Sequence, residues 1–191
     1  MSRETGRNGT PLLIRITAAV VLCALIAGGF YWYTDKGSAR KAESAVAKLE
    51  EIVPGVSDGS GSLNGASSAE LAAINIEGAD VVGILRIPSL DIDAPVAAKD
   101  ADEKYFAYIE EGTPADRGFR LYGKQSGLFR SLAGLMPGDN VSFTDVYGTT
   151  YEYKVTTQYH LKNWDEGDND LLLCYRTDSD TVFTVGCEGA E

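Results

Sequence analysis

The sequence predicts a mainly β protein: a small, closed or nearly closed β-barrel with short helices, preceded by a transmembrane helix and a helical stalk. Three observations support this fold class. An uncharged apolar segment lies near the N-terminus, and an amphipathic segment follows it. The rest of the 191-residue chain then holds short runs of β-forming residues separated by turn sequences. This length suits one domain with accessory segments.

The apolar segment covers residues 12–34, and the stretch from Ile16 to Thr34 carries no charge. Its length is close to the roughly twenty residues that a helix needs to cross a bilayer. Arg3, Arg7 and Arg15 lie on the N-terminal side of the uncharged stretch, so we expect residues 1–11 in the cytoplasm and the domain outside it. Aromatic residues at Phe30–Tyr33 suit the far lipid–water interface. A cleaved signal peptide is the alternative, although its apolar region would be shorter. The prediction is a single-pass protein of the cell membrane.

Residues 35–68 are expected to form a helical stalk and a linker rich in glycine and serine. Apolar residues recur there at alternating spacings of three and four, which predicts an amphipathic helix from about Lys36 to Val53. The later residues are typical of a flexible spacer. We expect this stalk to hold the domain of residues 69–191 away from the membrane. A helix that binds a specific partner is the alternative.

Short strands build the domain of residues 69–191, and turn sequences such as Pro137-Gly138-Asp139 separate them. The predicted strands are Val82–Pro88, Ile92–Val96, Phe119–Tyr122, Asn140–Phe143, Tyr151–Tyr159, Leu171–Tyr175 and Thr181–Cys187.

The charge of the chain excludes one class of partner. Beyond Thr34 the sequence holds 27 acidic and 14 basic residues, a net charge of −13. Such a surface repels nucleic acid and anionic lipid headgroups. We therefore expect no nucleic-acid partner, and membrane contact through the N-terminal helix alone.

The chain has three cysteines, and two of them lie in the predicted domain. The hairpin formed by the last two strands would place Cys174 opposite roughly Phe183. Cys187 would then lie four residues along, about 13 Å away at 3.3 Å per residue, which is beyond the reach of a disulfide. The sequence therefore predicts a free thiol at Cys174.

Six short motifs occur in the order in which one enzyme family carries them. They are NIE with VGILRIP at residues 75–88, IDAPV at 92–96, YF at 105–106, LYGKQ at 121–125, LFRSL at 128–132 and YEYKV at 151–155. Through these motifs residues 71–188 resemble a sortase, and its class B-like branch best. Sortases are membrane-anchored cysteine transpeptidases of Gram-positive bacteria, so the resemblance implies an eight-stranded β-barrel outside the membrane.

The resemblance also implies a catalytic cysteine, a histidine that acts as acid and base, and an arginine that stabilises the substrate or its oxyanion. The position of the nucleophile holds Cys174, but the histidine position holds Lys124 and the arginine position holds Val182. Two of the three catalytic groups are therefore replaced. A rival alignment makes Cys187 the nucleophile, and it leaves no room for the eighth strand.

The remaining groups could support the chemistry only in altered form. Lys124 could lower the pKa of the Cys174 thiol by charge attraction. A lysine with a pKa near 10.4 is, however, poorly suited to exchange protons at pH 7. Arg176 would share a strand face with Cys174 and could replace the lost arginine, and Arg130 is a further candidate by position. The candidate catalytic set is therefore Cys174, Lys124 and Arg176, and a buried strand cysteine is the alternative for Cys174.

Two other features carry weaker signals. His160, the sole histidine, is expected to be an exposed strand residue and not a relocated base. Acidic residues precede the nucleophile strand at Asp165, Glu166, Asp168 and Asp170. They could supply oxygen ligands to Ca²⁺, which some sortases bind in this vicinity, but we expect a solvated loop and no cofactor. The few His and Cys residues are badly spaced for zinc.

These features predict a membrane-anchored sortase-family protein that is catalytically degenerate. It would act at the cell surface as a module that binds a sorting-signal peptide or other cell-wall assembly proteins. The first alternative is a divergent, active cysteine transpeptidase that attaches sorting-signal proteins to the cell wall through Cys174. The second is a barrel that serves only as a structural part of an envelope or pilus assembly.

Overall fold

The computed structural model describes residues 21–25, 39–53, 71–76, 78–98, 105–125, 127–161, 169–178 and 181–190. The chain divides into two compact units, residues 1–37 and residues 38–191. In the first unit residues 21–25 are helical and exposed, and the rest of the predicted transmembrane segment lies outside the described residues, as does the linker. Within the described ranges, no helix is long and apolar enough to cross a membrane.

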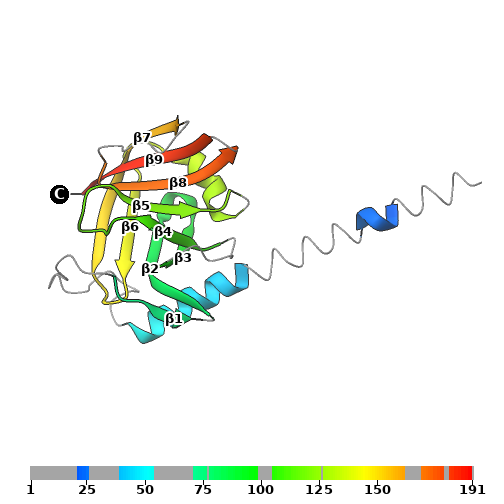
Figure 1. Cartoon of the computed structure of the whole chain (residues 1–191), viewed down its shortest axis with the longest axis horizontal. Helices are drawn as coiled ribbons and strands as arrows, with labels where there is room; N and C mark the ends of the chain where they lie inside the picture. Colours follow the sequence, from blue (N-terminus) through cyan, green and yellow to red (C-terminus); the bar gives the residue numbers. More distant parts are fainter. Residues whose placement is uncertain are drawn as a thin grey trace, which may run out of the picture. The chain divides into compact units, whose positions relative to one another are not determined.

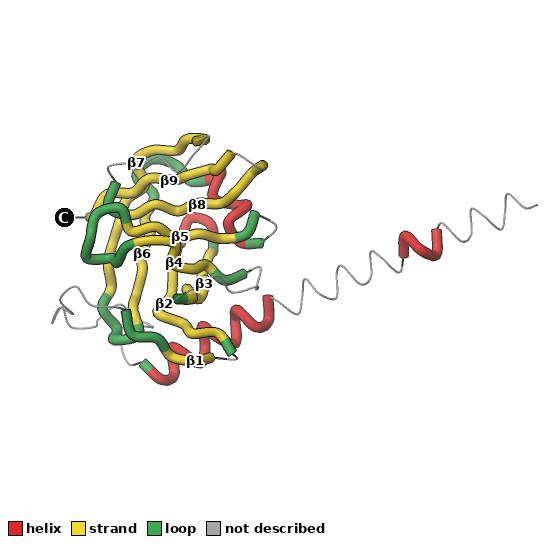
Figure 2. The backbone as a smooth tube through the Cα atoms, in the orientation of Figure 1, coloured by secondary structure: helices red, strands yellow, loops and turns green. Residues whose placement is uncertain are grey.

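The second unit contains a closed β-barrel, which confirms the predicted mainly β fold (Figures 1 and 2). The described strands are β1 (Ile74–Ile76), β2 (Ala79–Ile87), β3 (Ile92–Ala97), β4 (Ala107–Glu111), β5 (Phe119–Gly123), β6 (Asn140–Asp145), β7 (Thr150–Leu161), β8 (Leu171–Asp178) and β9 (Thr181–Gly189). Eight of them follow the order β2-β3-β4-β5-β8-β9-β7-β6, and β6 pairs with β2 to close the barrel. The ninth, β1, extends the sheet beside β2.

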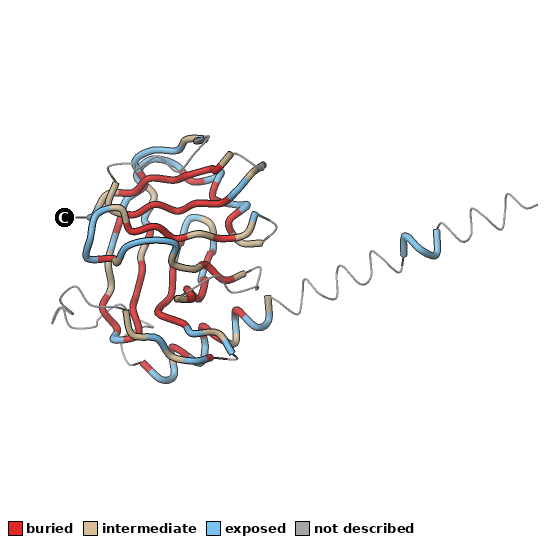
Figure 3. Tube along the Cα trace, viewed as in Figure 1, coloured by how far each residue is buried: buried red, intermediate tan, exposed pale blue. Residues whose placement is uncertain are grey.

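Most neighbouring strands are antiparallel, but the pairs β3–β4 and β5–β8 are parallel. Two 3₁₀ segments connect strands: the three-residue η1 (Pro88–Leu90) after β2 and the seven-residue η2 (Leu128–Gly134) after β5. The alternate side chains that point into the barrel form its main core, and Figure 3 shows β8 and β9 buried along most of their length. Members of this core include Leu85, Phe119, Phe143, Leu173 and Val185.

All seven predicted strands are present, and the sequence reading missed two others, β1 and β4. The first has only three residues, and the second ends in two glutamates, so neither shows a clear alternation of apolar and polar residues. Strand β4 is held by a parallel pairing with β3 and an antiparallel pairing with β5. Such long-range pairing leaves little trace in local sequence.

The amphipathic segment forms a helix over residues 39–52, but this helix does not stand as a stalk. Its apolar face is buried in a second core cluster on the outside of the barrel. On the helix this cluster includes Ala45 and Leu49, and on the barrel it includes Val81 and Ile84. Figure 1 shows the helix in cyan beside β1 and β2. The helix is therefore part of the folded domain.

Candidate functional site

Strands β5 and β8 lie side by side and bring Arg120, Tyr122 and Cys174 to one outer face of the barrel. In their parallel pairing Arg120 lies beside Leu172 and Tyr122 lies beside Cys174. The neighbouring residues Leu171 and Leu173 belong to the interior core. Because side chains alternate along a strand, Cys174 points to the opposite side, out of the barrel.

The thiol of Cys174 is nevertheless buried, with 1% of the residue exposed. It belongs to a small apolar cluster with Leu172 and Val182, against which Tyr122 packs. Its sulfur lies 3.6 Å from Oγ1 of Thr184, the residue directly opposite on β9. This thiol is covered by its own sheet neighbours.

Burial governs the acidity of this thiol. Desolvation raises the pKa of Cys174 to about 11, because the thiolate would lose its hydration. The hydrogen bond with Thr184 and the charge of Arg120 lower this pKa by smaller amounts, and the charge of Glu110 raises it. Nucleophilic cysteines have the opposite property, a lowered pKa, so this arrangement holds the sulfur as a neutral thiol.

The other two predicted catalytic residues occupy different surroundings. Lys124 follows the last residue of β5 and is partly buried, and its backbone carbonyl accepts a hydrogen bond from Gly127 N at 3.0 Å. Arg176 is exposed and lies opposite Val182 in the β8–β9 pairing. The charges that act on the Cys174 pKa are those of Arg120 and Glu110. The residues in the described part of this face thus surround the thiol without supplying a histidine.

Tyr122 packs against the cluster that contains Cys174 and also contacts Tyr108 and the backbone of Arg176. Its ring lies 5.3 Å from the ring of Tyr108 on β4, centroid to centroid, at an interplanar angle of 44°. Burial raises the pKa of the Tyr122 hydroxyl, while a hydrogen bond with the Arg176 backbone and the Arg176 charge lower it. The charge of Cys174 would raise it further. Tyr122 therefore lies opposite Cys174 and also contacts the backbone of Arg176.

Arg120 is a buried cation on this face that the sequence reading missed. Its side chain is only 8% exposed, and its Nη1 donates to Oε2 of Glu111 at 2.9 Å. The alternation in Phe119-Arg120-Leu121-Tyr122 places Arg120 and Tyr122 on the same side of β5. That alternation was the available signal, but it could not indicate that Arg120 would be buried.

Two other sequence candidates, Cys187 and His160, lie away from this face. Cys187 lies in the interior core, opposite Leu171 and Val155, and burial raises its thiol pKa to about 12. Cys174 and Cys187 are both free. His160 on β7 is exposed, and its ring lies 5.0 Å from that of Phe183. Asp165, Glu166 and Asp168 of the candidate calcium loop lie outside the described residues.

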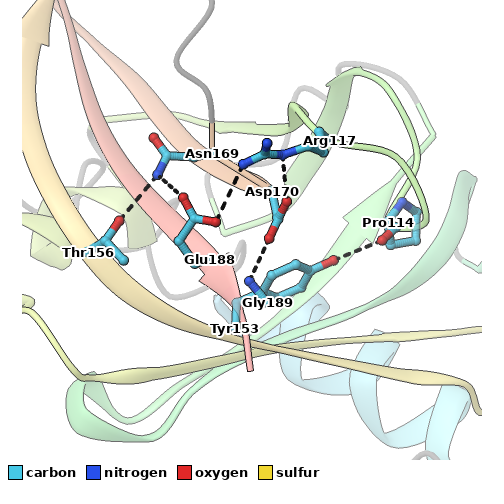
Figure 4. A network of polar contacts seen from close by, with 8 residues as sticks. All are labelled: Pro114, Arg117, Tyr153, Thr156, Asn169, Asp170, Glu188 and Gly189. Atoms are coloured by element: carbon cyan, nitrogen blue, oxygen red, sulfur yellow. Dashed lines mark hydrogen bonds and ion pairs between the residues drawn. The ribbon is translucent and has the colours of Figure 1, made fainter. Parts of the chain in front are cut away.

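A polar network ties the start of β8 to neighbouring segments (Figure 4). Asp170 Oδ1 accepts from Arg117 Nε at 3.1 Å, and its Oδ2 accepts from the Gly189 backbone N–H at 2.8 Å. Asn169 Nδ2 donates to Thr156 and Glu188, each at 3.2 Å. These contacts join the loop before β5 to β7, β8 and β9, so we regard the network as structural.

The network makes stability depend on pH in one direction. The pKa of Asp170 is lowered, mainly by the hydrogen bond from Gly189 and also by Arg117. A carboxyl group with a lowered pKa in the folded state stabilises the fold above its unfolded pKa of about 3.9, and the effect is lost as the pH falls through the folded pKa. We therefore expect Asp170→Asn to be less stable than the wild type near neutral pH, and the difference to shrink below about pH 4.

This expectation is checked by denaturant unfolding of both proteins across that pH range. Asp91→Asn is the matched control, because Asp91 is an exposed carboxyl group whose left-handed backbone (φ 54°) asparagine also adopts. The control should follow the wild type at every pH. A difference for Asp170→Asn that stays constant with pH would contradict the assigned role.

Comparison with solved structures identifies the fold, whereas no protein-family model and no curated protein matches the chain. Sortase A from Corynebacterium diphtheriae is similar with a TM-score of 0.52 at 17% identity, over 92% of this chain and 96% of that one. Sortase C1 from Streptococcus agalactiae gives 0.52 at 17% identity, over 78% and 89%. Sortase A from Listeria monocytogenes gives 0.50 at 20% identity, over 58% and 88%. These similarities show that the chain has the sortase fold, and they favour no single class.

Proposed function

We propose that this chain is a membrane-anchored protein of the sortase family whose catalytic apparatus has degenerated. It acts outside the cytoplasm as a module that binds a peptide or a partner protein at the cell surface. The fold supports the family, and the class B-like motifs in the sequence favour that branch. One observation supports the proposed loss of activity: the Cys174 thiol is buried, and its burial raises its pKa to about 11. The neighbouring Val182 occupies the position at which the resemblance to sortases implies an arginine.

The proposed anchor and the proposed partners are supported by the sequence. The apolar segment of residues 12–34 would cross the membrane once with residues 1–11 in the cytoplasm. The acidic domain surface argues against nucleic acid as a partner. A sorting-signal peptide or another cell-wall assembly protein is the proposed ligand, and the proposed activity needs no cofactor.

Alkylation of Cys174 by iodoacetamide tests the proposed loss of activity. A thiol with a pKa of about 11 is only about 0.03% thiolate at pH 7.5, against roughly 9% for a free cysteine with a pKa near 8.5. We therefore expect Cys174 in the folded full chain to react at least about 100-fold more slowly than in the denatured chain. Mass spectrometry of the cysteine-containing peptides separates Cys174 from the other two cysteines. Rapid alkylation that titrates below about pH 8 would contradict the proposal.

The alternative function, an active cysteine transpeptidase, is favoured by one observation. Arg120 lies on the face of Cys174, and its charge lowers the pKa of the thiol. In an active enzyme the Cys174 sulfur would attack the threonine carbonyl of a Thr–Gly bond in the peptide. The amide bond would break, the glycine amine would leave with a proton, and the threonine would remain as a thioester on Cys174. Mass spectrometry should detect this adduct in the wild type and not in Cys174→Ala. Peptide binding that survives in Cys174→Ala without any adduct supports the binding module.

A further inference from the structure

Strand β4 contains an irregularity directly opposite Arg120. In the β4–β5 pairing Ile109 lies opposite Leu121, but Glu111 and not Glu110 lies opposite Arg120. One extra residue is therefore inserted in β4, which is a β-bulge. Bulges commonly redirect a side chain. Here the bulge places two carboxylates, those of Glu110 and Glu111, along the strand beside one buried guanidinium.

The two side chains of the Arg120–Glu111 ion pair differ in their exposure to solvent. The arginine side chain is 8% exposed, whereas that of Glu111 is 66% exposed. A buried guanidinium strongly favours a nearby anion, because an uncompensated buried charge is costly. An exposed glutamate, in contrast, gives up little free energy when it leaves such a pair. Glu111 is therefore the exchangeable partner, and Arg120 is the fixed one.

Arg120 also lies close to the thiol and to aromatic surface. Arg120 and Cys174 are diagonal neighbours on adjacent strands, about 8 Å apart between Cα atoms for a strand spacing of 4.8 Å and an offset of two residues. Tyr122 lies two residues from Arg120 on the same side of β5 and directly opposite Cys174, and its ring packs near Tyr108. The face thus combines a fixed cation with two aromatic rings, a combination suited to an acidic group on a peptide.

We propose that Arg120 is the carboxylate-binding residue of this face, and that Glu111 occupies it in the unbound protein as an internal competitor. The ligand is a peptide carboxylate, supplied by a C-terminus or by an acidic side chain, which replaces Glu111 on the guanidinium. This inference rests on the proposed peptide-binding function and specifies its ligand. The anion-binding residue of this face would then be Arg120 on β5, because Val182 on β9 has no group that binds an anion.

Titration of the full chain in detergent micelles tests this exchange. The readout is the Nε–H resonance of Arg120 in ¹⁵N-labelled protein, assigned through its backbone. The probes are N-acetylglycine for a C-terminal carboxylate, N-acetylaspartate amide for an acidic side chain, and N-acetylglycinamide as the neutral control. We expect a saturable shift with at least one carboxylate probe and none with the neutral amide. The stronger of the two acids identifies the source of the carboxylate.

Two variants in the bulge distinguish competition by Glu111 for Arg120 from a general effect of removing one negative charge. Glu111→Gln should raise the affinity for the carboxylate probe about fivefold, because it weakens the internal competitor. Glu110→Gln removes the same charge from the adjacent position and should change the affinity by less than about twofold. Arg120→Lys should weaken binding, because lysine lacks the bidentate guanidinium fork. If Arg120→Lys fails to fold, the two glutamine variants still decide the question.

Several results would overturn the inference. They are the absence of a saturable Arg120 shift in both the wild type and Glu111→Gln, an equal shift with the neutral amide, and equal gains in affinity in the two glutamine variants. Cys174 alkylation is a separate readout. A reactive thiol with carboxylate binding at Arg120 would overturn the loss of activity and keep this inference. An unreactive thiol without carboxylate binding would support the loss of activity and overturn this inference.

Discussion

Substitution of Gly83 by alanine is expected to lower the free energy of unfolding by about 3 kcal/mol. Gly83 lies in β2 where this strand pairs with β6 and closes the barrel. An alanine Cβ there would lie 2.3 Å from the backbone carbonyl oxygen of Thr144 and 2.8 Å from the ring of Phe143. A backbone atom cannot rotate away, so the two strands would have to separate. Urea unfolding followed by circular dichroism measures the loss.

Gly134→Ala is the matched control for this substitution. A Cβ at Gly134 would meet its nearest neighbour, Leu90 Cδ2, at 3.4 Å, which is an ordinary contact. Both variants add one methyl group, but only one adds it inside a strand pairing. The control should be neutral to within about 0.5 kcal/mol. Equal stability of the two variants would show that β2 and β6 do not approach as closely as described.

Truncation of Leu49 to alanine is expected to cost about 2–5 kcal/mol. Leu49 is fully buried between the helix of residues 39–52 and the barrel. Its removal leaves a cavity in the second core cluster, so both the lost burial and the cavity contribute. The same unfolding measurement in urea gives the change. A stalk that stood free of the barrel would show no comparable loss.

Ile52→Ala on the same helix tests the interpretation of that loss. Ile52 is 56% exposed, so its truncation removes a similar side chain without opening a cavity. We expect a change within about 0.5 kcal/mol. If the two truncations cost the same, the helix does not contribute its apolar face to the domain, and the predicted stalk would regain support.

The sequence predicted the helix correctly, but it did not predict that the helix packs against the barrel. Periodicity shows that one face is apolar, but it does not show what covers that face. The covering residues come from segments far apart in the chain, including Val81, Ala97 and Val146. In β8, likewise, Leu171–Cys174 is an unbroken apolar run. Its inner and outer faces could be separated only once the strand was paired.

The strand pairing of Cys174 was predicted to within one residue. The hairpin estimate placed Cys174 opposite roughly Phe183, and the structure places it opposite Thr184. An irregularity between Arg176 and Asp178 shifts the pairing, and local sequence does not mark such bulges reliably. Arg120 was missed because the alternation of residues along β5 places its side chain on the outer face but does not show that this side chain is buried.

The order of the strands constrains when this domain can fold. Strands β8 and β9 come after the other described strands along the chain, yet they lie in the wall between β5 and β7. Until they arrive, β5 and β7 each present an unpaired edge, and edges of this kind invite pairing with other chains. The parallel partners β5 and β8 are also about fifty residues apart, and such distant pairings form slowly. The barrel can therefore close only after nearly all of its described strands have been synthesised.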